Sequence, residues 1–181
     1  MPLPKDNLYT SDDYWNLPEG QRSELIDGEL YDMAPPSRIH QRLISQLTVT
    51  ISNYIRSQSG SSEVYPAPFA VNLTSNEQTW VEPDISVICD KQKLSDRGCE
   101  GAPDWIIEIV SPSSSRLDYF VKLFKYRSSG VREYWIVNPM KKTVQTYSFE
   151  GDENSVQYSF DDIIHVEIYK DLEIRINDLL P

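Results

Sequence analysis

Residues 105–110, WIIEIV, are apolar at every position but one. Such a run predicts a strand over about 105–111 whose two faces are both buried, with Glu108 in its middle. A buried ionised carboxylate is costly unless it is paired or bound to a metal ion. Glu108 therefore needs a partner; the alternative is a protonated or arginine-paired glutamate in the core.

A second strand, predicted over residues 81–89, carries the companion acid. Period-two alternation places Glu82, Asp84 and Ser86 on one face of this strand. Pro83 cannot donate a ladder hydrogen bond, so it marks an edge, a bulge or a strand start. Interruptions of this kind often re-aim a side chain beside an active site. The alternative for Asp84 is a turn aspartate next to a proline.

A helix over residues 115–128 supplies Asp118 and Lys122, four positions apart. Its expected apolar stripe consists of Leu117, Phe120, Val121 and Phe124. Lys122 borders this stripe, so its ammonium group could reach the sheet. The alternative is an ordinary surface ion pair with Asp118, which would contribute a few tenths of a kcal/mol.

The remaining pattern predicts one α/β domain over residues 1–181: a mixed sheet flanked by helices, with an N-terminal hairpin and a C-terminal antiparallel meander. The Asp27-Gly28 turn favours the hairpin, and three- and four-residue apolar spacing favours a long helix. The other expected elements are helices 10–19 and 39–57, hairpin 25–33, strands 63–73 and 133–137, a loop over 91–103, and meander strands 143–149, 155–160, 164–169 and 172–176.

Two carboxylates on adjacent strands suggest metal-assisted phosphodiester hydrolysis. A divalent cation polarises the phosphate and lowers the pKa of the attacking water. Mg²⁺ prefers a few carboxylate oxygens and keeps several waters. We therefore expect Asp84, Glu108 and the backbone carbonyl of Ile109 as ligands of Mg²⁺ or Mn²⁺. Lys122 would orient the water or stabilise charge that develops on the phosphate.

Several short motifs in a fixed order carry a family resemblance. They are Glu24–Leu30 (ELIDGEL), Ala34–Ser37, His40-Gln41, Pro83-Asp84, Glu108–Ser113, Asp118 with Lys122 and Tyr126, and Gly130–Val137. Together they resemble the Uma family of restriction endonucleases, within the PD-(D/E)XK nuclease-like superfamily. The resemblance covers the chain from about residue 14 to its C-terminus and implies a restriction-endonuclease-like fold.

The resemblance also implies roles for individual residues. Asp84 matches the aspartate of the first half-motif and Glu108 the acid of the second. The sequence departs from the superfamily pattern at Val110, where a lysine usually stands, and Lys122 on the next helix takes that place. Glu24 would be a further site carboxylate, or else a partner of Arg22 or of a backbone amide. His40 would contact phosphate or substrate, or else be an exposed residue at the start of its helix.

The net charge of −11 and the pI of about 4.6 bear directly on any DNA-binding role. Nucleic-acid binders usually present a basic face, and this chain has no Lys/Arg run longer than Lys141-Lys142. Either the basic residues converge in space, or a metal ion supplies the positive charge, or the partner is not nucleic acid.

The sequence also gives expectations about compartment and assembly. We expect a cytoplasmic protein without membrane partners, because no apolar run approaches the roughly 18 residues of a membrane helix and the N-terminus lacks an apolar leader. Cys89 and Cys99 have no disulfide or zinc pattern. A homodimer is a further expectation, since restriction-like enzymes cut two strands and two-fold dimers are common.

The sequence thus predicts a Mg²⁺- or Mn²⁺-dependent endonuclease that hydrolyses DNA. Two alternatives stay open at this point. One is a non-catalytic binding or assembly module on the same fold, which the negative charge favours. The other is a hydrolase of a smaller phosphoester that uses the same metal site.

Overall fold

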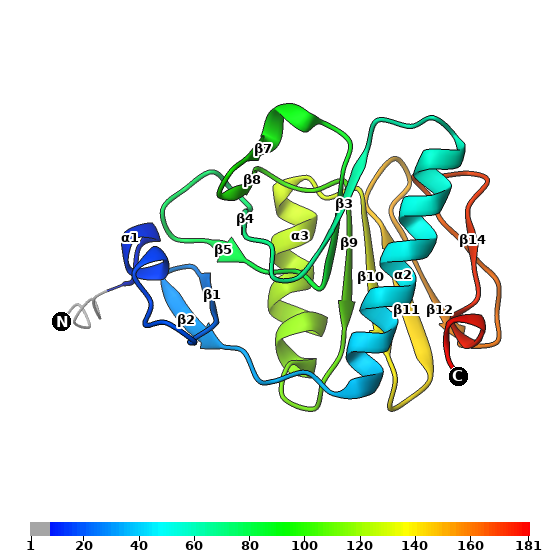
Figure 1. Ribbon diagram of the computed structural model, residues 1–181, viewed down its shortest axis with the longest axis horizontal. Helices are drawn as coiled ribbons and strands as arrows, with labels where there is room; N and C mark the ends of the chain where they lie inside the picture. The colour runs from blue at the N-terminus through cyan, green and yellow to red at the C-terminus, as the bar shows by residue number, and fades with distance from the viewer. Residues whose placement is uncertain (1–7) are drawn as a thin grey trace.

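A six-stranded mixed sheet forms the centre of the molecule (Figure 1). Its order is β12-β11-β10-β9-β6-β3; β9 and β10 are parallel and the other neighbours antiparallel. Its strands are β3 (Glu63–Pro66), β6 (Ile85–Ile88), β9 (Trp105–Ile109), β10 (Glu133–Asn138), β11 (Thr143–Ser148) and β12 (Asn154–Ser159). The computed structural model describes residues 8–181. Residues 1–7, part of the stretch expected to lack a leader, lie outside the described residues.

The predicted strand 105–111 is confirmed as β9, and all five of its residues are buried. Trp105, Ile107 and Ile109 belong to one hydrophobic core, and Ile106 belongs to the other. Side chains alternate between the two faces of a strand, so β9 contributes to both cores. Glu108 lies on the same face as Ile106.

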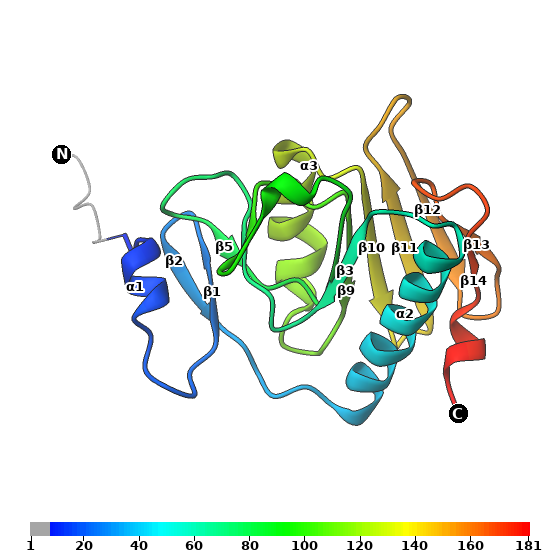
Figure 2. The same cartoon turned by 45° about the horizontal axis from the view of Figure 1, so that its top comes forward.

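The long helix α2 (Arg38–Ser57) covers the face of this sheet that carries Trp105, Ile107 and Ile109 (Figure 2). The expected helix 39–57 is therefore confirmed. Its buried residues recur at spacings of three and four: Leu43, Ile44, Leu47, Ile51 and Ile55. The Ser37 side chain caps the helix by accepting a hydrogen bond from the His40 backbone N–H at 3.3 Å. The C-terminal segment packs on the same face, with Phe160, Ile164 and Ile176 in this core.

A second sheet and a helix cover the opposite face. The sheet has the order β2-β1-β5-β4-β8-β7. Its strands are β1 (Ser23–Ile26), β2 (Glu29–Asp32), β4 (Val71–Asn72), β5 (Trp80–Val81), β7 (Leu94–Ser95) and β8 (Gly98–Glu100). Strands β1 and β2 form the predicted hairpin, with Asp27 at φ 51° and Gly28 at φ 81°, as a type I′ turn requires.

Three predicted segments are corrected by the structure. Segment 63–73 divides into β3 and β4, which belong to different sheets, and Pro83 divides segment 81–89 into β5 and β6. The expected loop 91–103 contains the 3₁₀ helix η1 (Lys91–Lys93), β7 and β8. The turn between β7 and β8 depends on Gly98 at φ 137°, where a Cβ atom would lie 2.0 Å from the Ala70 carbonyl oxygen. Short strands fixed by such close approaches leave little periodicity in the sequence.

The chain ends also differ in extent from the prediction. The helix expected over 10–19 is shorter and is α1 (Ser11–Trp15). Pro18 disfavours helical backbone at the residue before it, Leu17, so the helix cannot continue. In the meander, β11 and β12 are antiparallel as expected and extend the main sheet, whereas β13 (Ile164–His165) and β14 (Glu173–Ile174) are shorter than expected and form a separate pair. The 3₁₀ helix η3 (Ile176–Leu179) follows. None of the helices in residues 8–181 has the length and apolarity needed to cross a membrane.

The helix expected over 115–128 is present, and Leu117 and Val121 of its predicted apolar stripe pack against the core, whereas Phe120 and Phe124 do not. It consists of a π-helical part, η2 (Leu117–Lys122), and α3 (Leu123–Ser129), and Gly130 ends it at φ 101°. Phe120 and Phe124 are 70% and 67% exposed, and the face turned to the sheet carries Asp118, Lys122 and Tyr126. The most buried positions of this helix are polar because they contact Glu108, and a periodicity of apolar residues does not reveal such a contact.

Candidate active site

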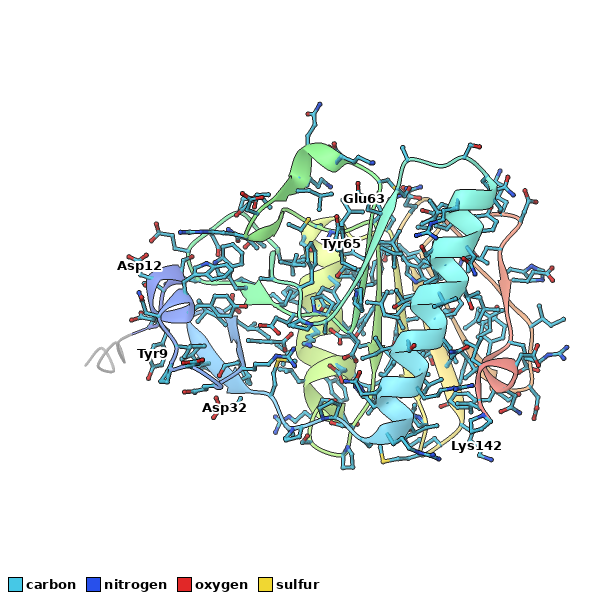
Figure 3. The ribbon with its side chains drawn as sticks, in the orientation of Figure 1. Tyr9, Asp12, Asp32, Glu63, Tyr65 and Lys142 are labelled. Carbon is cyan, nitrogen blue, oxygen red and sulfur yellow. The ribbon has the colours of Figure 1, made fainter. Side chains whose placement is uncertain are left out.

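Glu108 forms part of the wall of a cavity of about 540 Å³. The cavity lies between the start of α2, the hairpin β1–β2 and the first turns of η2, and residues of all three elements line it. Asp32, at the end of β2, is one of the lining residues and is labelled in Figure 3. Lys142, also labelled there, lies in the β10–β11 turn and does not line the cavity.

Asp84 and Glu108 lie side by side, as the strand pattern predicted. Asp84 directly precedes β6, which pairs with β9. The Ile109 backbone N–H donates to Asp84 Oδ2 at 2.7 Å, and the Asp84 backbone N–H donates to Glu108 Oε2 at 3.3 Å. Both residues are buried, at 7% and 3% exposure. Pairing across β6 and β9 therefore fixes two adjacent carboxylates at the cavity wall.

Lys122 lies inside the protein and not at the border of a surface helix. Its Nζ atom is 2.9 Å from Glu108 Oε1 and 3.6 Å from Asp118 Oδ1, and the residue is only 4% exposed. The interpretation of Asp118 and Lys122 as a surface ion pair is therefore wrong. A buried lysine can keep its charge only with partners of this kind.

Glu24 joins this cluster from the second sheet. Its Oε2 atom is 2.8 Å from Lys122 Nζ, and its Oε1 atom accepts the Glu82 backbone N–H at 2.8 Å. Arg22, the alternative partner considered for Glu24, pairs with Glu82 instead. Both oxygens of Glu24 are thus engaged by groups of the protein, which links the hairpin to the lysine.

His40 reaches the cluster from the first turn of α2. Its Nε2 atom lies 3.2 Å from Asp84 Oδ2, and it lines the cavity. Burial acts to lower the pKa of His40, but the Asp84 carboxylate and the Ile109 backbone outweigh burial, so the net pKa is raised. The alternative of an exposed helix residue is therefore wrong, and His40 carries positive charge more readily than a free imidazole does.

Two residues of the cluster were not among the predicted site residues. Asp118 is buried beside Lys122, and the Tyr126 hydroxyl donates to Glu108 Oε1 at 2.6 Å. Asp118, Lys122 and Tyr126 recur every four residues, so they share one helical face. A polar four-residue repeat on a helix next to a strand with a buried acid is the signal that could have identified them.

The cluster holds more negative than positive charge. Four carboxylates, those of Glu24, Asp84, Glu108 and Asp118, share Lys122 and His40. Burial and the neighbouring acids raise the pKa of Glu108 well above its usual range, with Lys122 opposing. Burial likewise raises the pKa of Asp118. Lys122 has a raised pKa because three carboxylates outweigh its burial. Such a surplus favours uptake of protons or of a cation.

The carboxylate oxygens of this cluster are the kind of ligand that a hard divalent cation prefers. Within residues 8–181, no three His, Cys, Asp or Glu side chains are already arranged to hold a metal ion by themselves. Mg²⁺ usually binds through one or two carboxylates and keeps several of its waters. Asp84 and Glu108 provide such a pair, and the Ile109 backbone lies beside them. Glu24 and Asp118 lie on the lysine side of Glu108.

Comparison with known proteins bears on the fold and on the family. A solved structure, described as a "putative nuclease belonging to DUF820" from Anabaena variabilis ATCC 29413, superposes with a TM-score of 0.74 at 23% identity, covering 94% of this chain and 96% of that one. The expected nuclease-like α/β fold is thereby confirmed.

Two relatives from Synechocystis sp. (strain ATCC 27184 / PCC 6803 / Kazusa) are similar in sequence. "Uncharacterized protein slr1290" is 23% identical over 76% of this chain and 72% of its own length. "Uncharacterized protein sll1609" is 26% identical over 73% of this chain and 75% of its own length. The family model Uma2, described as "Putative restriction endonuclease", matches residues 11–177. The chain therefore belongs to the Uma2 family, as the motifs of its sequence indicated.

Proposed function

We propose that this protein is a Mg²⁺- or Mn²⁺-dependent endonuclease that hydrolyses DNA phosphodiester bonds. The observation that carries the proposal is the surplus of buried carboxylates around Lys122 at the wall of an open cavity. A fold gains nothing in stability from four acids that share one lysine and one histidine. A site that recruits a cation for catalysis explains the arrangement.

In this proposal Asp84, Glu108 and the Ile109 carbonyl hold the ion. The ion supplies charge that polarises the phosphate and lowers the pKa of an attacking water. Lys122 binds Glu108 Oε1 at 2.9 Å, so it fixes the carboxylate and places a positive charge beside the reacting phosphate. His40 holds Asp84 through Nε2 and offers a cationic contact to the substrate phosphate.

Glu24, Asp118 and Tyr126 act through other residues in this proposal. Glu24 and Asp118 hold the Lys122 ammonium group from two further sides, and the Tyr126 hydroxyl donates to the same Glu108 oxygen as Lys122. These are positioning residues. A well-supported shell of this kind keeps ligands and lysine in one arrangement while substrate enters.

The direct test measures cleavage of supercoiled, linear and single-stranded DNA with Mg²⁺ and with Mn²⁺. The wild type should cut at least one form, and Asp84→Asn and Glu108→Gln should not. Matched controls replace the exposed acids Glu77 and Asp96, which do not line the cavity, with alanine. Failure of the wild type to cut any DNA form with either ion would overturn the proposal.

The negative charge of the chain favours one alternative, a binding or assembly module that retains the fold without catalysis. In such a module no metal ion offsets the repulsion among the surplus acids, so Asp84→Asn and Glu108→Gln should raise the free energy of unfolding. A Mn²⁺ titration separates the two functions. A melting temperature that rises with Mn²⁺ in the wild type, and not in Asp84→Asn, supports the metal site.

A smaller phosphoester is the other alternative substrate, since a cavity of about 540 Å³ lies in the range of small-molecule sites. Screening nucleotides and phosphodiester esters alongside DNA distinguishes it. Sedimentation tests the expected homodimer.

A further inference from the structure

The outer face of the helix η2–α3 carries exposed aromatic side chains. Within residues 8–181, Phe120 and Phe124 are the most exposed large hydrophobic residues, at 70% and 67%. They lie four positions apart, so they are neighbours on one helical face. The opposite face of the same helix contacts the proposed active site through Asp118 and Lys122. Two adjacent exposed phenylalanines are costly in water, which points to a partner.

Positive charge accompanies these aromatics. Arg116 and Arg127 are exposed and lie before and after the two phenylalanines; we call Arg116, Phe120, Phe124 and Arg127 the outer stripe. Of the other basic residues in 116–132, Lys122 is buried in the acidic cluster, Lys125 pairs with Asp27, and Arg132 pairs with Asp104 and Glu150. The outer stripe therefore presents two exposed arginines beside two exposed phenylalanines, in a chain whose net charge is −11.

The outer stripe is continuous with the cavity. Arg116 lines the cavity, as do Leu117 and Val121 from the same helix. A polymer that passes along the stripe therefore reaches the cavity at the start of η2. Arg127 pairs with Glu153, but both side chains are largely exposed, and such pairs contribute little to stability. A phosphate group can take the place of Glu153.

We propose that the outer stripe binds single-stranded nucleic acid and guides it into the active site. Unpaired bases stack on Phe120 and Phe124, and phosphates contact Arg116 and Arg127. Aromatic platforms interleaved with arginines are typical of proteins that bind single strands without sequence preference. The inference rests on the proposed nuclease function and specifies its substrate as a single strand or an unpaired flap.

Charge complementarity favours this partner over two others. A second copy of the chain packed through the stripe would bring an arginine at each end against an arginine of its partner, in either helix orientation. Duplex DNA hides the faces of its bases, so it would contact the arginines and leave both phenylalanines in water. A single strand satisfies both kinds of side chain.

The test measures fluorescence anisotropy of a labelled oligothymidylate with the full-length protein in EDTA, so that no cleavage occurs. Phe120→Leu/Phe124→Leu keeps apolar area but removes stacking, and we expect binding at least tenfold weaker, about 1.4 kcal/mol. Phe120→Trp/Phe124→Trp should bind at least as tightly as the wild type. Val156→Ala/Ile163→Ala, which truncates exposed apolar residues elsewhere, should bind as the wild type does.

Three results would overturn the inference: no binding by the wild type, equal binding by the leucine variant, or a wild-type dimer that the leucine variant retains and Phe120→Ala/Phe124→Ala loses in sedimentation. The effect of Mn²⁺ on the melting temperature distinguishes failure of the stripe proposal from failure of the proposed nuclease function. If Mn²⁺ stabilises the wild type while the oligonucleotide does not bind, the metal site stands and the stripe does not. If the stripe binds DNA but Mn²⁺ has no effect, the stripe stands and the nuclease proposal fails.

Discussion

Glu108 and Glu133 are two buried glutamates on neighbouring parallel strands, and they lie in contrasting environments. Glu108 on β9 faces η2 and α3, beside Lys122, Tyr126 and three more acids. Glu133 on β10 lies on the other face of the sheet, with Trp135, where it accepts the Trp135 indole N–H at 2.6 Å and the Ile168 backbone N–H at 3.0 Å. Glu133 does not line the cavity.

The contrast shows that burial alone does not distinguish a carboxylate at the cavity wall from one in the core. Both residues are almost inaccessible, at 3% and 1% exposure, and burial raises the pKa of both. Glu133 is satisfied by two neutral donors, which a structural acid requires. Glu108 belongs to a cluster whose acids outnumber its cations, at the wall of a cavity. Surplus charge and a position at the cavity wall distinguish Glu108 from Glu133.

The largest expected difference concerns activity. Glu108→Gln should lower DNA cleavage by about 10³-fold or more, because a metal site contributes several kcal/mol to stabilisation of the transition state and each 1.36 kcal/mol is tenfold. Glu133→Gln, measured at equal concentrations of folded protein, should keep activity within a few-fold of the wild type. Equal losses in the two variants would contradict the distinction between the two glutamates.

Removal of the lysine should have the next largest effect, on stability. Lys122→Met leaves Glu24, Glu108 and Asp118 buried without their shared cation. We expect the free energy of unfolding in urea to fall by about 3–5 kcal/mol. Glu24→Gln added to Lys122→Met should restore part of this loss. If the double variant is as unstable as the sum of the single variants, the two side chains are not coupled.

Glu133 should make stability depend on pH. Burial raises its pKa from 4.5 to about 7. Below pH 4.5 both folded and unfolded chains carry the proton, and between the two pKa values only the folded chain keeps it. The contribution of Glu133 to stability therefore decreases as pH rises from about 4.5 to 7, by about 3 kcal/mol at most.

Urea unfolding of the wild type and of Glu133→Gln at pH 4.5 and 7.5 measures this contribution. The difference in free energy of unfolding between the two proteins should change across that range. The same pH dependence in both proteins would show that Glu133 does not titrate within it.

The smallest expected effect is stabilisation by metal. Mn²⁺ at one hundred times its dissociation constant should raise the free energy of unfolding of the wild type by about 2.7 kcal/mol. Glu133→Gln should show the same rise in melting temperature, and Glu108→Gln should show little. Stabilisation of Glu108→Gln by Mn²⁺ to the wild-type extent would place the ion elsewhere.

The sequence by itself determined the central strand, the hairpin and the long helix. Each has a strong local signal: an apolar run at 105–110, the Asp27-Gly28 turn, and apolar spacing of three and four from Leu43 to Ile55. It also singled out Asp84 and Glu108, because a carboxylate in an apolar strand and an acid after a strand-breaking proline conflict with their surroundings.

Only the tertiary structure decided which face of the helix η2–α3 is buried, how segments 63–73 and 81–89 divide between two sheets, and that Glu24 and Asp118 surround Lys122. Hydrophobic periodicity predicts only which apolar residues are buried. In this helix Lys122 is buried because its partners, Glu24 and Glu108, lie at distant positions in the sequence and contact it only in the folded chain. Because Lys122 turns inward, Phe120 and Phe124 on the opposite face of the helix are exposed to solvent. The energy of a buried charge depends on groups that meet only when the chain is folded, so the local pattern around Lys122 could not reveal its environment.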